Sequence, residues 1–82
     1  MSYYVFDQYA KVNLWEVRIS AEDKYGFFEH DEYGEGGGLW FESVDGSPST
    51  LSLIDYDGRA VLPKDVAAAI RQLGHVVSED FD

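Results

Sequence analysis

The feature that most constrains the fold is a short stretch in which apolar and polar side chains alternate. Over residues 15–20 the apolar side chains are Trp15, Val17 and Ile19, and the polar ones are Glu16, Arg18 and Ser20. An alternation with a period of two is typical of a β-strand with one buried face and one face in water. We therefore expect a sheet that is apolar on one side and solvated on the other.

Further runs rich in β-branched and aromatic residues predict the other strands. These runs are residues 3–6, 25–30, 39–44 and 51–56. The first of them is expected to pair with the strand at 15–20. Val12 and Leu14 are out of phase with that strand, which indicates either a bulge near residues 14–15 or a strand that begins at Leu14. Asp57 and Gly58 predict a two-residue hairpin turn that leads into a strand at 59–62.

A glycine-rich segment, residues 31–38, separates the strands at 25–30 and 39–44. It contains four glycines and three carboxylates. Glycine is free to adopt positive φ, and the neighbouring carboxylates repel one another. The segment therefore predicts a flexible, solvated hairpin loop.

One helix is predicted, at residues 63–73. Pro63 suits the first helical position, Asp65 and Arg71 complement the helix dipole, and Gly74 suits the left-handed residue after the end. Its apolar stripe consists of Val66, Ala67, Ile70 and Leu73. Residues 75–77 predict a short strand or extended segment, and residues 79–82 form an acidic tail.

These elements define an α+β fold, a small antiparallel sheet of four to six strands with one C-terminal helix packed on one face. We expect the order β-β-β-β-β-α-β in a single domain of residues 1–82. A chain of 82 residues builds at most one core. Its content of 45% apolar and 16% aromatic residues exceeds that of disordered chains.

Composition narrows the cellular setting. The chain has no cysteine, which excludes disulfides and thiolate metal sites, and its N-terminal residues lack the basic and apolar regions of a secretory signal. No apolar run approaches the roughly 20 residues that cross a bilayer. The acidic balance disfavours both anionic lipid and direct binding of nucleic acid. We expect a cytoplasmic protein.

Negative charge is concentrated in two segments, residues 22–45 and the acidic tail at 79–82. The net charge is −10, and residues 22–45 carry eight acids against the single base Lys24. We expect the segment at 22–45 to bind a partner. The candidate partner-binding residues are Glu22, Asp23, Glu29, Asp31, Glu32, Tyr33, Glu35, Glu42 and Asp45.

Adjacent aromatic residues add to this hypothesis. Phe27 and Trp40 can fill the core face of the sheet. Phe27 is followed by Phe28, however, and Trp40 by Phe41, and neighbours on a strand face opposite sides. Some aromatic surface must then be exposed or covered by another layer. Aromatics rimmed by carboxylates are typical of an interface for a basic partner.

The motifs offer little support for a cofactor, a metal or catalysis. Side chains of residues 29–32 would alternate between strand faces, so they do not converge on a cation. Residues 55–58 lack the glutamate of a calcium loop, and residues 34–38 lack the lysine of a phosphate loop. A serine nucleophile would need His30 or His75 as its base, and His75 is expected at the C-terminus of the helix, where a cation is favoured. We expect neither cofactor nor catalysis.

The sequence thus predicts a small acidic binding protein that blocks a basic surface of a nucleic-acid-handling protein. Carboxylates two apart on a strand stand about 6.5–7 Å apart, a coarse match to the charge spacing of nucleic acid. In size and charge the chain resembles the inhibitors that phages deploy against bacterial defence nucleases, including anti-CRISPR and anti-restriction proteins. This resemblance carries over no residues.

Three alternatives remain. The same electrostatics would serve an immunity protein or an antitoxin against a basic nuclease. The chain could also be a small metal-dependent or acid-base enzyme, or an accessory domain whose charge aids solubility. The sequence does not specify an oligomeric state.

Overall fold

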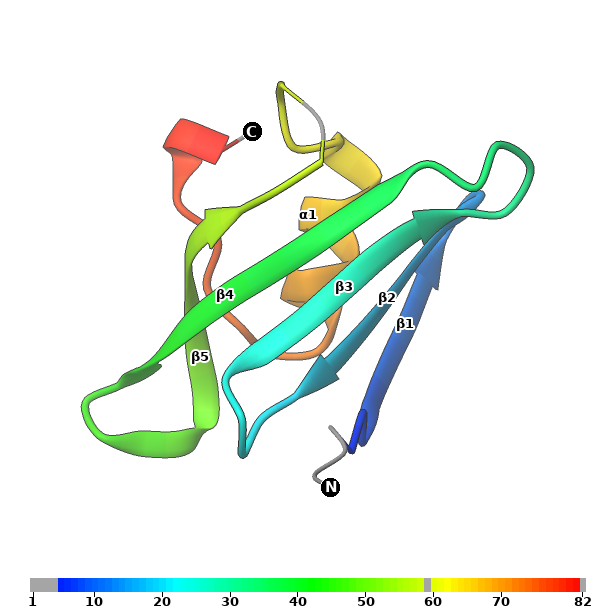
Figure 1. Cartoon of the computed structure of the whole chain (residues 1–82). Helices are drawn as coiled ribbons and strands as arrows, with labels where there is room; N and C mark the ends of the chain where they lie inside the picture. The colour runs from blue at the N-terminus through cyan, green and yellow to red at the C-terminus, as the bar shows by residue number, and fades with distance from the viewer. Residues whose placement is uncertain (1–4, 59, 82) are drawn as a thin grey trace.

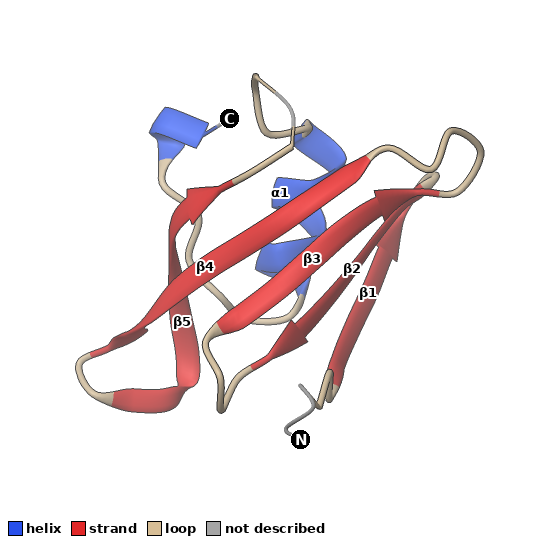
Figure 2. Cartoon of the chain, viewed as in Figure 1, coloured by secondary structure: helices blue, strands red, loops and turns tan. Residues whose placement is uncertain are grey.

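Five antiparallel strands form a curled sheet, and one helix packs against one of its faces (Figures 1 and 2). The computed structural model describes residues 5–58 and 60–81. The elements are β1 (Gln8–Val12), β2 (Trp15–Ser20), β3 (Tyr25–His30), β4 (Gly36–Val44), β5 (Ser47–Tyr56), α1 (Lys64–Gln72) and the 3₁₀ turn η1 (Glu79–Phe81). Each strand pairs with the next one along the chain. The predicted α+β class, with a C-terminal helix on one face, is confirmed.

The alternation in β2 separates the two faces of the sheet as the sequence predicts up to Ile19, whereas Ser20, expected in water, is only 1% exposed. Val17 and Ile19 are fully buried, whereas Arg18 between them is exposed. In register with Val17 lie Ala10 of β1 and Phe28 of β3, which are also buried. We call this side, against which α1 packs, the inner face and the opposite side the outer face. Figure 1 shows the molecule from the outer face, with α1 behind the strands.

The first strand differs from the prediction. It begins at Gln8, and Val5 and Phe6 lie in no strand, while residues 3 and 4 lie outside the described residues. The phase change near Leu14 is a chain reversal, neither the predicted bulge nor a strand beginning at Leu14. Val12 pairs with Trp15, and Asn13 takes the positive φ of 55° that tight hairpin turns require.

Three of the four glycines predicted to form a loop, at residues 36–38, belong instead to β4, whereas Gly34 lies in the loop with a φ of 67°. A Cβ at Gly36 would lie 2.0 Å from the carbonyl oxygen of Phe28, and one at Gly37 would lie 1.4 Å from that of Asp57. Glycine is therefore required at these two positions because other backbone segments approach them closely. The tendency of glycine to form loops gives no sign of this requirement. The connection between β3 and β4 shortens to residues 31–35.

The chain then makes a tight turn in the break predicted between the strands at 39–44 and 51–56. Asp45 and Gly46 have φ values of 52° and 74° and join β4 to β5 as a hairpin. The predicted hairpin at Asp57 and Gly58 is wrong, since residues 60–62 form no strand and residue 59 lies outside the described residues. The N–H of Asp57 instead donates to the carbonyl of Gly38, and the chain leaves the sheet for α1.

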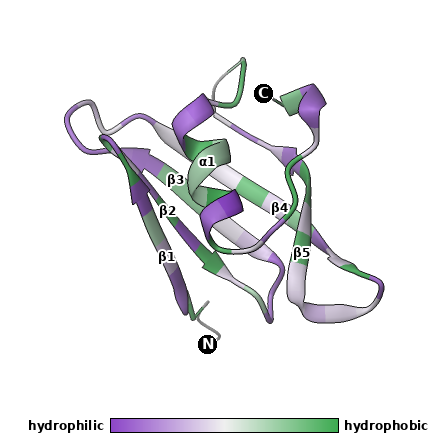
Figure 3. Cartoon of the chain, turned by 180° about the vertical axis from the view of Figure 1, so that it is seen from behind, coloured by the Kyte–Doolittle hydropathy of each residue, from purple (hydrophilic) through white to green (hydrophobic). Residues whose placement is uncertain are grey.

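The helix matches the prediction to within a residue, with Pro63 at its N-cap and Gly74 at a φ of 87° after its end. Figure 3 shows α1 in front of the sheet, with hydrophobic segments of the strands behind it. Its buried side chains are Val66, Ala67, Ala69 and Ile70. The two alanines let the helix approach the sheet closely. No helix among the described residues has the length and apolar character of a membrane span.

Residues after the helix complete the inner layer. Val76 forms an isolated parallel bridge with Ser52, which confirms the extended segment predicted at 75–77. His75 follows the C-terminus of the helix as predicted, but it does not act there as a cation, because the residue is only 4% exposed. Its Nδ1 accepts a hydrogen bond from the N–H of Leu51 at 2.9 Å, which leaves the proton on Nε2 to be donated to Oε1 of Gln8. Burial lowers the pKa of His75, so the imidazole is a neutral link between β1 and β5.

Candidate functional site

Aromatic rings gather on the outer face of β3 and β4. The ring of Phe27 meets that of Phe6 edge to face, with centroids 5.0 Å apart, and the rings of Tyr25 and Trp40 lie 5.7 Å apart. Tyr25 and Trp40 are cross-strand partners, as are Phe27 and Gly38. The helix lies on the other side of the sheet, so this cluster forms a second apolar surface outside the core.

Trp40 is the most informative member of the cluster. A Cβ on Gly38 would lie 2.8 Å from the benzene ring of the Trp40 indole, so that ring occupies the space above the Gly38 backbone. The side chain nevertheless remains 39% exposed. Such an aromatic side chain, supported by the sheet and open to solvent, is common at the centre of protein interfaces.

A β-bulge determines which side chains surround Trp40. Trp40 pairs with Asp55 whereas Phe41 pairs with Leu53, so Ile54 is an extra residue in β5. The bulge shifts the alternation of the strand. Ile54 and Asp55 are both exposed, and Tyr56 turns inward to pack against the core. Without the extra residue, Asp55 would occupy the inner side of the strand.

Two of the basic side chains near this face already have partners. The guanidinium of Arg18 lies 4.6 Å from the ring centroid of Tyr9. The Tyr9 hydroxyl donates to Glu16 at 2.8 Å, and this bond to a carboxylate raises the pKa of Tyr9. Lys11 forms an ion pair with Asp31, which lowers the pKa of Asp31 and raises that of Lys11.

The structure places the nine predicted partner-binding residues in two groups rather than one. Turns at one end of the sheet carry Glu22, Asp23 and Asp45, and the β3–β4 loop at the other end carries Asp31, Glu32, Tyr33 and Glu35. Glu29 and Glu42 lie between these groups, exposed on the outer face. β4 has nine residues, so the two ends stand about 30 Å apart.

The β3–β4 loop packs around His30. His30 is 8% exposed, and its Nδ1 accepts hydrogen bonds from the backbone N–H groups of Glu32 and Tyr33 at 3.1 and 3.2 Å. The Tyr33 ring stacks on the imidazole with centroids 4.5 Å apart. These contacts direct the loop carboxylates outward.

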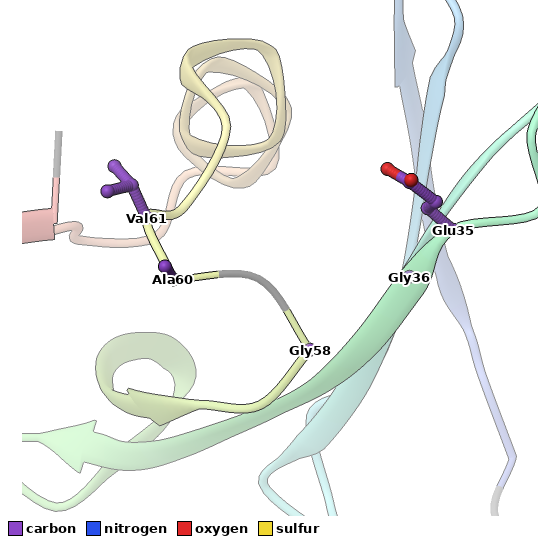
Figure 4. A pocket seen from close by; sticks show the side chains of 5 residues that line it. All are labelled: Glu35, Gly36, Gly58, Ala60 and Val61. Atoms are coloured by element: carbon purple, nitrogen blue, oxygen red, sulfur yellow. The ribbon is translucent and has the colours of Figure 1, made fainter.

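A shallow cavity of about 510 Å³ lies beside this loop (Figure 4). Its lining residues are Glu35, Gly36, Gly58, Ala60 and Val61. Glu35 is the ionisable residue among these five, so the lining offers no second carboxylate for acid-base chemistry. Within the part of the chain that the structure describes, no three metal-ligating side chains come together.

Within each pair of adjacent aromatic residues, the one expected in the core from the sequence was the wrong one. The conclusion that aromatic side chains lie on both faces of the sheet was nevertheless right. Phe28 and Phe41 fill the core, and Phe27 and Trp40 face outward. That large aromatics must face both sides of the strands is confirmed. Asp55 and Ile54 were missed as members of the surface, because nothing in the local sequence signals the bulge.

Comparison with known proteins identifies no relative: no protein-family model matches the chain, and no curated protein or solved structure matches it significantly.

Proposed function

We propose that this chain is a small acidic binding protein that uses the outer face of its sheet to block a basic surface of another protein. The observation that carries the proposal is the aromatic cluster on the face opposite α1, with carboxylates around and between its rings. The inner face is closed by α1 and by the segment at 75–77, so the core does not account for the outer aromatics.

The charge distribution favours a partner with a positively charged surface. Of the outer-face acids, Glu29, Glu42 and Asp55 are exposed. Acids at both ends of the sheet extend this negative surface over about 30 Å. Opposite charge on the partner would speed association, and the aromatics would supply the desolvated contact area.

A protein that handles nucleic acid is the class of partner that this surface suits best. Such proteins present extended basic grooves, and a row of carboxylates can compete for them. Inhibition of a defence nuclease in the cytoplasm, or neutralisation of a toxin nuclease as an immunity protein or antitoxin, are specific forms of this function. We propose a binding role and no catalytic one.

Capture of partners by charge-reversed variants tests the proposal. Glu29→Lys with Glu42→Lys reverses two outer-face charges, whereas Glu79→Lys with Asp80→Lys makes the same change in net charge on the C-terminal turn η1. Immobilised wild type and both double variants are exposed to bacterial lysates at low and high salt, and captured proteins are quantified by mass spectrometry.

We expect the wild type and the η1 variant to retain the same basic nucleic-acid-binding protein, and the outer-face variant to lose it. Retention should weaken as salt rises, because the charges involved are exposed. Equal capture by all three proteins at low salt would contradict the proposal, as would equal loss from both variants. Circular dichroism verifies that each variant is folded.

A further inference from the structure

We propose that Trp40, Glu42 and Asp55 form a subsite on the outer face that binds an arginine side chain of the partner. This inference rests on the proposed function and specifies its chemistry. A cation placed on the exposed indole would have one carboxylate beside it along β4 and another across the strand pair on β5.

The positions of the three side chains follow from strand geometry. Trp40 and Glu42 are two apart on β4, so they share the outer face at about 6.5–7 Å. Asp55 is the direct cross-strand partner of Trp40, and such partners stand about 4.5–5.5 Å apart at Cβ. All three residues are exposed. The Trp40 indole leans from this position over Gly38, so the flexible Glu42 and Asp55 side chains would turn toward it to meet the N–H groups of a guanidinium stacked on its plane.

The bulge at Ile54 makes this arrangement possible. It turns Asp55 outward, and it places an apolar side chain that is 51% exposed next to the same site. Bulges of this kind commonly re-aim a side chain beside a functional site. The carboxylate of Asp55 therefore reaches the outer face through a specific irregularity of the strand.

The same face already holds one guanidinium on an aromatic ring. Arg18 lies over Tyr9, its cross-strand partner between β1 and β2. Tyr9 in turn donates to the carboxylate of Glu16. The chain thus contains an internal example of a guanidinium over an aromatic ring, the contact that we assign to Trp40 and a partner's arginine.

Arginine fits this subsite better than lysine. A guanidinium is planar, stacks on aromatic rings and donates two parallel hydrogen bonds to a carboxylate, whereas an ammonium is a compact and strongly hydrated charge. Tryptophan is the ring that binds cations best. A subsite that bound cations by charge alone would not prefer arginine to lysine.

The chain has two tryptophans, which permits a test with an internal control. Trp15 packs against Phe28 and His30 on the inner side of the sheet, with ring centroids 5.8 and 4.9 Å away. We would titrate ¹⁵N-labelled protein with acetylated, amidated tetra-arginine and follow the two indole N–H resonances. Tetra-lysine of equal charge is the matched probe.

We expect tetra-arginine to shift the Trp40 indole resonance and leave that of Trp15 in place. Tetra-lysine should bind about two- to fivefold more weakly, the ratio that one cation-ring contact at a surface supplies. A Trp40 resonance that does not move, or equal affinities for the two peptides, would overturn the subsite. The absence of binding to either peptide at millimolar concentration would overturn it as well.

Variants separate this inference from the proposed function. Trp40→Leu should abolish the preference for arginine, measured by the anisotropy of labelled peptides. Glu42→Gln with Asp55→Asn should weaken tetra-arginine binding more than Glu79→Gln with Asp80→Asn, which removes equal charge from η1. If the preference persists in Trp40→Leu, the subsite is wrong, yet loss of partner capture by the lysine variants at Glu29 and Glu42 would still support a charge-driven binding protein.

Discussion

The two faces of one sheet differ in what their aromatic side chains do. On the inner face Phe28 and Phe41 are 1% and 4% exposed and belong to the core. On the outer face Phe27 contacts Phe6, and Trp40 remains 39% exposed above a glycine. Adjacent residues of the same strands thus take part in two different surfaces, one that stabilises the fold and one that is available to a partner.

This difference would let a small protein separate folding from the binding that we propose. One core is all that 82 residues support, and the inner face, α1 and the segment at 75–77 provide it. The outer face is then free to carry exposed aromatics and carboxylates. Substitutions on the inner face should therefore affect the free energy of unfolding, and those on the outer face should affect binding.

The largest expected effect comes from adjacent phenylalanines. Phe28→Ala should lower the free energy of unfolding by about 3–5 kcal/mol, because it opens a cavity in the core. Phe27→Ala should cost only about 1 kcal/mol, the scale of an aromatic pair. Urea unfolding followed by circular dichroism measures both losses, and equal losses would show that the two faces do not differ as described.

Two glycines give the next contrast. Gly37→Ala should cost about 3 kcal/mol, because the added methyl group meets the backbone of Asp57 at 1.4 Å. At Gly46 the added group meets nothing within 4 Å, and only the φ of 74° opposes it, so Gly46→Ala should cost about 1 kcal/mol. Thermal unfolding of the two variants checks the order, and a more damaging change at Gly46 would contradict it.

Much of the inner face was predictable from local sequence. The alternation in β2 and the helix with Pro63 and Gly74 are local patterns, and the structure confirms both. The hairpin at Asn13 and the glycine strand at 36–38 were not predictable in this way. The glycine strand depends on contacts between segments distant in the sequence, such as the approach of Asp57 to Gly37. The turn at Asn13 is local, but it lacks the Asn-Gly or Asp-Gly pair that signals a two-residue hairpin.

The candidate site was predictable only in its composition. Acidic and aromatic residues could be identified, but their division between two ends of the sheet follows from the strand order. The outward position of Asp55 depends on one extra residue in the pairing of β4 with β5. Register is a property of the assembled sheet, and the identity of a single strand does not determine it.

The smallest effect concerns the buried imidazole that links β1 to β5. Burial lowers the pKa of His75, so the unfolded chain takes up a proton more readily once the pH falls below about 6.5. The contribution of His75 to stability is therefore fully present above that pH and decreases as the pH falls toward the lowered pKa of the folded protein. The free energy of unfolding should therefore decrease in mild acid.

Urea unfolding between about pH 7.5 and pH 5.5 measures this loss. In His75→Asn the side-chain oxygen can still accept from the N–H of Leu51, but nothing titrates at this position. The variant should be less stable than wild type at the upper pH and should lose less stability on acidification. The same decrease in both proteins would show that His75 does not cause it.

The central claim is that Trp40 contributes to binding while its inner-face counterpart Trp15 contributes to folding. The most direct test measures how much of the captured basic partner Trp40→Ser retains at low salt. Trp15→Ser and wild type are measured beside it, all well below their melting temperatures. We predict that Trp40→Ser loses the partner and keeps most of its stability, and that Trp15→Ser keeps the partner and melts earlier. Full retention by a folded Trp40→Ser protein would contradict the account.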